Sequence, residues 1–476
     1  MAIWLLANSR YFVLFRMVLI LQCIFITRVM YRIITAFVLA FLPLTMLFSQ
    51  DGRNEEYQSV TSEYNGDWRF RFGGYGEMYA SWKDYGLNRW SGSTVGNSKK
   101  NHAEIAIPRF VLALDYKLSP KWILGAEIEF ESGGVGTAYE LETGTGSENG
   151  EYEQEFEKGG EVALEQFHIT RLIAREFNVR VGHLVLPVGL TNGHHEPVNF
   201  FGTTRPEGET TIFPSTWHET GISFFGTVGK GYGTFNYQAM IVAGLNPNGF
   251  SKYDWVKGGR QNLFELDNFT SPAWIARLDY VGVPGLRIGG SFYFINDAGG
   301  NADKLNTYAS LGKIPVRIWN IDGEYVNKYF ILRGNIISGH VGHAAGITRI
   351  NNSYSKLSPY GRKAPFASGA LTYSADLGVR VKSFIKNEKF PDIIPFAHYE
   401  YYNPQQVMDA GQTADERCQV SMWRMGLNWE PLPNLVVKAD FTTRQIGTQK
   451  VFGTTRFNSE NEFNIGIAYA GWFFKR

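Results

Sequence analysis

The stretch Leu435-Val-Val-Lys-Ala-Asp-Phe-Thr-Thr-Arg444 alternates apolar and polar residues. In an extended strand, Leu435 and Phe441 fall on one face, and Lys438 and Asp440 fall on the other. If the strand crosses a bilayer, the opposite assignment directs Lys438 at lipid, at a cost of roughly 2–4 kcal/mol near the midplane. The pattern therefore predicts a membrane strand with an apolar outer face and a charged inner face.

Segments of this kind recur along the chain, and the gaps between them are alternately short and long. Such a rhythm is typical of closed barrels in bacterial outer membranes. We therefore predict an all-β fold, a 16-stranded antiparallel transmembrane β-barrel that is porin-like, with short periplasmic turns and long extracellular loops. The expected strands are 68–82, 103–117, 121–131, 161–174, 178–186, 219–226, 233–243, 273–281, 286–295, 315–325, 329–338, 367–382, 393–402, 419–429, 435–444 and 462–474.

The beginning of the chain has the composition of a secretory leader. The first 49 residues contain four Arg and no acidic residue, and an apolar run over 33–47 ends just before Ser49. A basic segment followed by an apolar segment and a small residue is typical of a signal that is removed after export. We predict a leader over 1–49, with Met17 or Met30 as alternative true starts.

The rest of the chain is expected to form a short periplasmic segment over 50–67 and a barrel over 68–476. Without the leader, 42 of the 46 basic residues remain against 45 acidic residues, a net charge of −3 that does not favour nucleic acid as a partner. Cys418 is then the one cysteine, so it has no internal disulfide partner, and nothing near it has metal-ligand spacing. We predict no cofactor and no metal.

Charged residues on the inner faces would set what the pore prefers. The basic residues assigned to the lumen are Arg69, Arg71, Arg109, Arg277, Arg287, Arg333, Arg380, Arg424, Lys438 and Arg444. The acidic ones are Glu77, Asp115, Glu127, Glu129, Glu131, Asp279, Asp322, Glu324, Asp376, Glu400 and Asp440. Ten basic residues against eleven acidic residues predict no net bias of the lumen toward anions or cations. The candidate pore-lining residues are Arg277, Arg287, Arg333, Arg380, Arg424 and Lys438, with Glu127, Glu129, Asp279, Asp376 and Asp440.

Two stretches carry a family resemblance. The segments Arg180-Val-Gly-His-Leu-Val-Leu-Pro-Val-Gly189 and Pro214-Ser-Thr-Trp-His-Glu-Thr-Gly221 resemble motifs of the phosphate-selective porin O and P family, in the form common in Bacteroidota outer membranes. Together with the opening Phe72-Gly-Gly-Tyr-Gly-Glu77 and the strand count, the resemblance spans most of 68–476. It implies a trimeric 16-stranded diffusion porin. The chain departs from a phosphate-selective pore in lacking a one-sided Arg/Lys ladder, and anions such as phosphate remain one candidate solute class.

The loop over about 187–218 is the expected constriction, because it resembles the loop that folds into the lumen of 16-stranded porins. Its candidate residues are His194, His195, Glu196, Arg205, Glu207 and Glu209. We expect its acidic residues to face basic residues of the wall across a narrow neck, where charges act strongly on ions. The adjacent His194 and His195 lack the i, i+4 spacing of helical zinc sites, so no metal is predicted here.

The predicted function is passive diffusion of small hydrophilic solutes or ions through a water-filled channel. The protein would reach the bacterial outer membrane through the periplasm, contact lipid and lipopolysaccharide there, and form a homotrimer. Poor alternation in 161–174 and 178–186 agrees with strands that are buried against another subunit. One alternative is a barrel-anchored surface interaction protein without an open channel. A barrel enzyme is the other, although no Ser lies in a G-x-S-x-G context and no catalytic residues are predicted.

This topology predicts where the long loops lie. An epitope tag inserted within residues 145–150 should be stained on intact cells, because the short turns all follow even-numbered strands and the long loops then face outward. Staining that requires a permeabilised outer membrane, in a strain whose lipopolysaccharide does not shield the tag, would contradict the assignment.

Overall fold

The computed structural model describes residues 59–85, 89, 103–141, 154–261, 266–304, 306–353, 365–385, 387, 389–448, 450–451, 454–455 and 459–476. For 132–141, 154–161, 450–451 and 454–455 it describes the backbone alone. The chain divides into two compact units, Met1–Glu56 and Tyr57–Arg476, and every described residue belongs to the second. The predicted leader and the proposed tag site at 145–150 lie outside the described residues.

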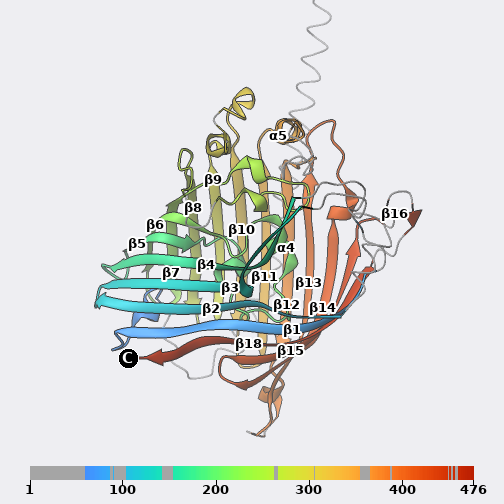
Figure 1. Ribbon diagram of the computed structural model, residues 1–476. Coiled ribbons are helices and arrows are strands. Elements are labelled where there is room, and N and C mark those ends of the chain that lie inside the picture. Colours follow the sequence, from blue (N-terminus) through green and yellow to red (C-terminus); the bar gives the residue numbers. More distant parts are fainter. Residues whose placement is uncertain are drawn as a thin grey trace, which may run out of the picture. The chain divides into compact units, whose positions relative to one another are not determined.

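Sixteen antiparallel strands form one closed barrel, which confirms the predicted fold class (Figure 1). Consecutive strands pair with each other, and β1 pairs with the last strand, β18, to close the ring. The barrel strands are β1 (Phe70–Asp84), β2 (Ala103–Ser119), β3 (Trp122–Leu141), β4 (Gln154–Leu172), β5 (Asn178–Val185), β6 (His218–Val228), β7 (Phe235–Val242), β8 (Ala273–Val283), β9 (Leu286–Ile295), β10 (Val316–Val326), β11 (Phe330–Val341), β12 (Gly369–Val379), β13 (Asp392–Val407), β14 (Val420–Leu432), β15 (Leu435–Ile446) and β18 (Ser459–Lys475).

The remaining elements lie in the connections. The α-helices are α3 (Leu190–Gly193), α4 (Glu207–Ile212) and α5 (Ala344–Asn351). The 3-10 helices are η1 (Ser62–Tyr64), η3 (Gly231–Gly233), η4 (Pro247–Gly249), η5 (Lys257–Gly259), η6 (Ala298–Asn301), η7 (Ala309–Leu311), η8 (Val381–Phe384) and η9 (Glu416–Cys418). The strands β16 (Lys450–Val451) and β17 (Thr454–Thr455) pair only with each other. Within the described part of the chain, no helix is long and apolar enough to span a membrane.

Most strands begin and end close to the predicted positions, and the clear exception is the hairpin of β3 and β4. The expected loop over 132–160 is partly strand, because β3 continues to Leu141 and β4 begins at Gln154. This extension pairs only within itself, whereas β2 leaves β3 after Glu131. A two-stranded ribbon that has no lipid-facing strand beside it needs no alternation of apolar and polar residues. The pairing of its two strands therefore could not be recognised from the sequence pattern.

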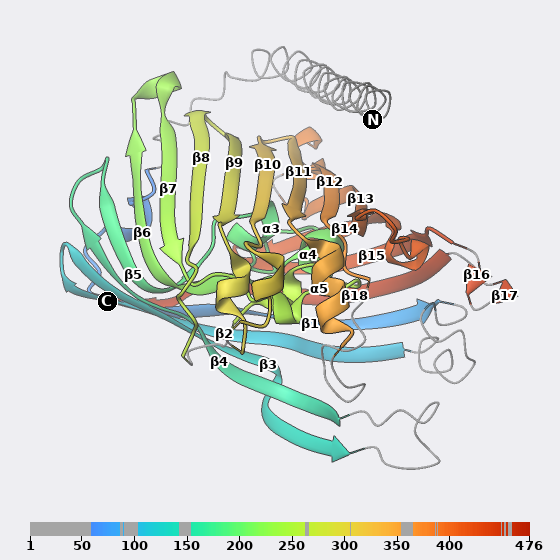
Figure 2. The same ribbon diagram turned by 90° about the horizontal axis from the view of Figure 1, so that it is seen from above.

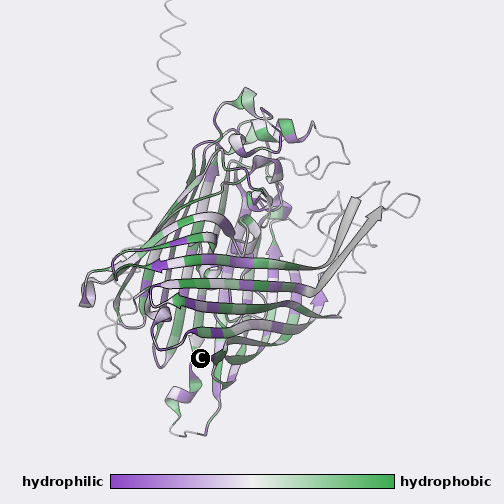
Figure 3. Cartoon of the chain, turned by 60° about the vertical axis from the view of Figure 1, so that its left-hand side comes forward, coloured by the Kyte–Doolittle hydropathy of each residue, from purple (hydrophilic) through white to green (hydrophobic). Residues whose placement is uncertain are grey.

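The two faces of the wall differ as the alternation predicts, and Figure 3 shows hydrophobic and hydrophilic residues interleaved along the strands. On β15, Phe441 is 50% exposed on the outer face, whereas Lys438 and Asp440 are each 2% exposed on the inner face. The outer face of β3 carries exposed Trp122 and Ile128. Exposed large apolar side chains on one face are what a strand in contact with lipid requires.

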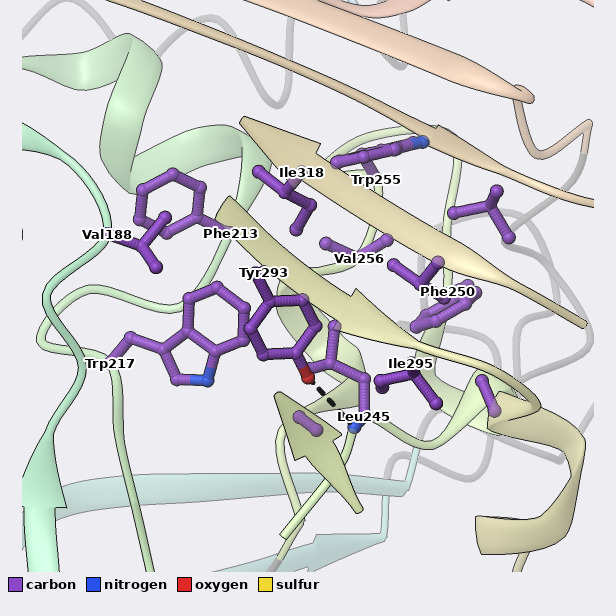
Figure 4. Close-up of a cluster of buried hydrophobic side chains, with 14 of the residues drawn as sticks. Val188, Phe213, Trp217, Leu245, Phe250, Trp255, Val256, Tyr293, Ile295 and Ile318 are labelled. Atoms are coloured by element: carbon purple, nitrogen blue, oxygen red, sulfur yellow. Dashed lines mark hydrogen bonds between the residues drawn. The ribbon is translucent and has the colours of Figure 1, made fainter. Parts of the chain in front are cut away.

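A large apolar cluster covers part of the inner wall near the long loops. Inward residues of β7 to β11, such as Tyr293, Ile295 and Ile318, pack against Phe250 and Trp255 of the β7–β8 loop (Figure 4). Burying each such side chain contributes roughly 1.5–3 kcal/mol. The loops on this side are therefore packed like the core of a globular protein.

This cluster and one β-bulge explain the poor alternation that suggested a subunit interface. Leu184 near the end of β5 and Leu186 just after it belong to the apolar cluster, so apolar residues stand there at positions where the pattern expects polar, lumen-facing ones. In β4, Gln166 pairs with Glu127 and Leu164 pairs with Ile128, which leaves Glu165 as an extra residue that shifts the pattern. The irregular pattern thus has a cause within the chain itself.

The contact of the outer face with lipid predicts that the free-energy cost of a charged substitution there depends on its depth in the bilayer. Leu427 lies in the middle of β14 and is 53% exposed, and Leu432 lies at its end and is 62% exposed. We expect Leu427→Lys to lower the free energy of unfolding by about 2–4 kcal/mol and Leu432→Lys by about 0–1 kcal/mol. Equilibrium unfolding in denaturant from lipid vesicles measures both values, and equal losses would contradict the placement of this strand in the bilayer.

Candidate functional site: a charged loop inside the barrel

The β5–β6 loop, residues 186–217, carries α3 and α4 and lies within the ring of strands (Figure 2). Inward side chains of β13, β14 and β15 hold one side of this loop. Because an inward-folded loop narrows the lumen of a barrel, the loop and the wall that faces it form the candidate functional site.

Lys438 is the central anchor of the loop. Its Nζ donates hydrogen bonds to the carbonyl oxygens of Pro197, Phe200 and Gly202, at 2.6, 2.7 and 2.8 Å. The ammonium group also lies 4.3 Å from the centroid of the Phe200 ring. All three of its donors are therefore used by the loop, and the side chain is 2% exposed.

Asp440 and Arg424 hold the next residues of the loop. Asp440 Oδ2 accepts from the backbone N–H of Thr203 at 2.7 Å and from the hydroxyl of that residue. Arg424 donates to the carbonyl oxygen of Thr204 at 2.6 Å, to its Oγ1 at 2.9 Å and to Thr442 Oγ1 at 2.8 Å. These strongly buried charges fix the backbone of the loop instead of lining open water.

The start of α4 is fixed by a carboxylate and an ion pair. Glu400 accepts hydrogen bonds from the backbone N–H groups of Glu207 and Gly208, at 2.8 and 2.7 Å. The Glu207 carboxylate pairs with Arg444 and accepts from the Tyr402 hydroxyl at 3.1 Å. Burial acts to raise the pKa of Glu207, but the guanidinium groups of Arg444 and Arg424 together lower that pKa below its usual value.

Glu209 is structural within the loop. Its carboxylate accepts from the backbone N–H groups of Leu190 and Thr191, both at 3.1 Å, and from the Asn335 side chain at 2.7 Å. Burial raises the pKa of Glu209 to about 7, although the backbone donors act in the opposite direction. At 1% exposure this residue does not face the neck, which differs from the arrangement expected from the sequence.

The other basic candidates on the wall are paired with acidic residues. Arg277 and Arg287 both bind Asp279 and Asp322, with Arg277 Nη2 at 2.7 Å from Asp279 Oδ1 and 3.0 Å from Asp322 Oδ1. Nearer the short turns, further pairs join Arg333 to Glu324, Arg380 to Asp392 and Glu430, and His398 to Asp376. These clusters leave little net charge on this part of the wall.

A cavity of about 330 Å³ opens on another side of the loop, beside β3 and β4. Glu129, Glu131 and Glu165 line it from the strands, and Arg205 lines it from the β5–β6 loop. The β7–β8 loop contributes Asp254, Lys257 and Arg260. Among the described residues, Glu129 and Glu131 form no ion pair, so acidic groups of the wall face basic groups of two loops across this space.

The other candidate residues of the loop, His194, Glu196 and His195, lie in different surroundings. His194 is exposed and lines a small cavity of about 50 Å³ with Glu324 and Arg333. Glu196 accepts from the Asn199 side chain at 2.7 Å. His195 is buried next to Glu165, a residue that the sequence reasoning missed because the bulge in β4 hides its direction.

The anchor at Lys438 predicts a test of loop docking. Lys438→Met keeps an unbranched side chain but removes the donors of three buried carbonyl groups, each of which makes a hydrogen bond worth roughly 1.5–3 kcal/mol with a charged partner. We expect proteinase K to cut residues 193–208 of this variant much faster than those of the wild-type barrel. Val437→Met, on the outer face of the same strand, is the control. Equal protection of both variants would mean that the loop is held by other contacts.

Comparisons with known proteins agree with this architecture. No family model matches the chain, so membership of the porin O and P family stays a prediction. An uncharacterised protein of Aquifex aeolicus is 22% identical over 393 residues, which cover 79% of this chain and 76% of that protein.

Solved structures with a similar arrangement are bacterial outer-membrane proteins. Salmonella typhi OmpF, in complex with daunomycin, has a TM-score of 0.51 and 10% identity, over 85% of this chain and 98% of that one. The outer membrane channel DcaP of Acinetobacter baumannii has a TM-score of 0.46 and 10% identity, over 84% and 97% of the two chains. The likeness to OmpF shows that the chain has the 16-stranded barrel fold of a porin.

Proposed function

We propose that this protein is an outer-membrane porin, a water-filled channel for the passive diffusion of small hydrophilic solutes or ions. The observation that carries the proposal is a closed 16-stranded barrel whose lumen contains an anchored loop and a charged cavity. Barrels of this size leave an aqueous channel when no separate domain fills them. The apolar outer face would contact lipid, and the long loops would reach lipopolysaccharide.

The charges of the lumen support a channel with only a mild preference between anions and cations. The wall from β8 to β13 is largely neutralised by its own ion pairs, so it offers no one-sided ladder for anions such as phosphate. In the cavity, Glu129 and Glu131 stand on the strand side, and Arg205, Lys257 and Arg260 come from the loops. Such a transverse arrangement would orient dipolar solutes more than it would select ions of one sign.

The main alternative is a barrel that anchors surface loops without an open channel. The apolar cluster beneath the β7–β8 loop is the observation that favours this alternative, because the cluster fills part of the lumen. Liposome swelling separates the two functions. Vesicles that contain the purified protein should swell in isotonic solutions of small sugars and amino acids, at rates that fall as the solute grows. Vesicles that do not swell, although the barrel is folded, would support the anchor.

A homotrimer remains part of this proposal and rests on the family resemblance. The irregular strands β4 and β5 no longer argue for it, because the bulge and the apolar cluster account for them. The native mass of the detergent-purified protein tests the assembly, and a monomer alone would contradict it.

The acidic wall of the cavity predicts a shift in ion preference. Glu129→Gln combined with Glu131→Gln should move the reversal potential in a KCl gradient toward anions, because two unpaired acidic groups are removed while Arg205, Lys257 and Arg260 remain. The shift should be largest at low salt, where screening is weakest. Glu176→Gln is the control, since this side chain is 60% exposed in the turn between β4 and β5. An unchanged reversal potential in the double variant would mean that ions do not pass through this cavity.

A further inference from the structure

Three possible metal ligands from separate parts of the chain meet beside the cavity. Glu127 comes from β3, Glu165 comes from β4, and His195 comes from the β5–β6 loop. Each offers one ligand atom, and the three atoms lie within 4.8 Å of one another. Binding a divalent metal requires ligand atoms that converge on one point in this way. No local sequence motif indicates here that these three residues come together.

The hydrogen bonding of His195 determines which ring nitrogen is available. Its Nδ1 lies 3.2 Å from the carbonyl oxygen of Asn192, and because a carbonyl only accepts, Nδ1 must carry the hydrogen. In the neutral ring, Nε2 is then a bare acceptor. That atom is buried, has no hydrogen-bond partner and lies 3.3 Å from Glu165 Oε1, which is also buried and without a hydrogen-bond partner. Two facing acceptors require a cation or a proton between them.

The second polar atom of each carboxylate is already occupied. The Tyr75 hydroxyl donates to Glu165 Oε2 at 2.7 Å, and Gln166 Nε2 donates to Glu127 Oε2 at 2.7 Å. Metal ligands are commonly held in this way, with a histidine donating its other N–H to a carbonyl and carboxylates fixed by further hydrogen bonds. All three side chains therefore have the outer partners that orient ligands toward a shared point.

Two further features agree with a built site. Glu165 is the extra residue of the β4 bulge, and bulges often redirect a side chain next to a functional site. The guanidinium of Arg109 donates to Glu77 Oε1 at 2.9 Å and to the His195 carbonyl at 3.2 Å. Its charge is thus compensated by Glu77.

We propose that Glu127, Glu165 and His195 bind a first-row divalent transition metal, with Zn²⁺ as the probe. One imidazole nitrogen and two carboxylate oxygens suit zinc better than calcium or magnesium, which prefer oxygen ligands. The ion would tie the β5–β6 loop to β3 and β4, on a different side from the anchors at Lys438 and Arg444. The loop would then be fixed to both sides of the barrel.

Zinc binding by the purified, chelator-stripped full-length protein tests the site. Competition with a fluorescent zinc chelator should give a single Zn²⁺ per chain for the wild type. His195→Ala, Glu165→Gln and Glu127→Gln should each weaken binding by more than the roughly 10–100-fold that loss of an outer partner costs. His194→Ala is the matched control, because it removes the adjacent, exposed histidine and should leave zinc affinity unchanged.

Heat-modifiable mobility on gels and far-UV circular dichroism establish that each variant is a folded barrel. Wild-type protein without measurable zinc affinity would overturn the proposal and favour a proton between His195 and Glu165. Equal affinity in folded His195→Ala and wild type would overturn it as well. The test does not depend on whether the barrel conducts.

Discussion

The hydrogen bonds that close the barrel are the constraint on which the rest of the structure depends. A lipid bilayer offers no partner for a backbone N–H or C=O group, so a sheet can cross it only when every edge is paired. The long ladder between β1 and β18, from Arg71 with Lys475 to Asp84 with Asn461, removes the last two edges. Once the ring is closed, alternation must direct one face of each strand to lipid, and the polar face necessarily surrounds the lumen.

Those inward polar groups are used in two different ways. On β13, β14 and β15 they bind the β5–β6 loop, and Lys438, Asp440, Arg424 and Glu400 meet its carbonyl oxygens and N–H groups directly. On β3, Glu129 and Glu131 form no ion pair in the described structure and border the cavity. The loop thus owes its position to basic and acidic residues of β13, β14 and β15 together, and the charges that meet solutes would lie on the acidic side at β3.

The same physical constraints explain which features of the fold and of the candidate site could be predicted from the sequence. The cost of charge in lipid assigned Lys438 and Asp440 to the lumen, and the strand count follows from the alternation of short and long gaps. Alternation indicates whether a side chain points to lipid or to the lumen, but not what it contacts there. It therefore did not reveal that Lys438 binds the loop or that Glu209 is buried within it. Glu165 was missed because a bulge reverses the direction that the pattern implies. His195 was judged against local spacing, whereas its neighbours come from distant strands.

Single-channel recording in planar bilayers shows directly whether the barrel is a water-filled channel. The purified, folded barrel should insert in repeated steps, and each step should have a stable, ohmic conductance that scales with salt concentration. Bilayers that remain silent, although the protein in them is shown to be folded and inserted, would contradict a water-filled channel and leave the barrel as an anchor.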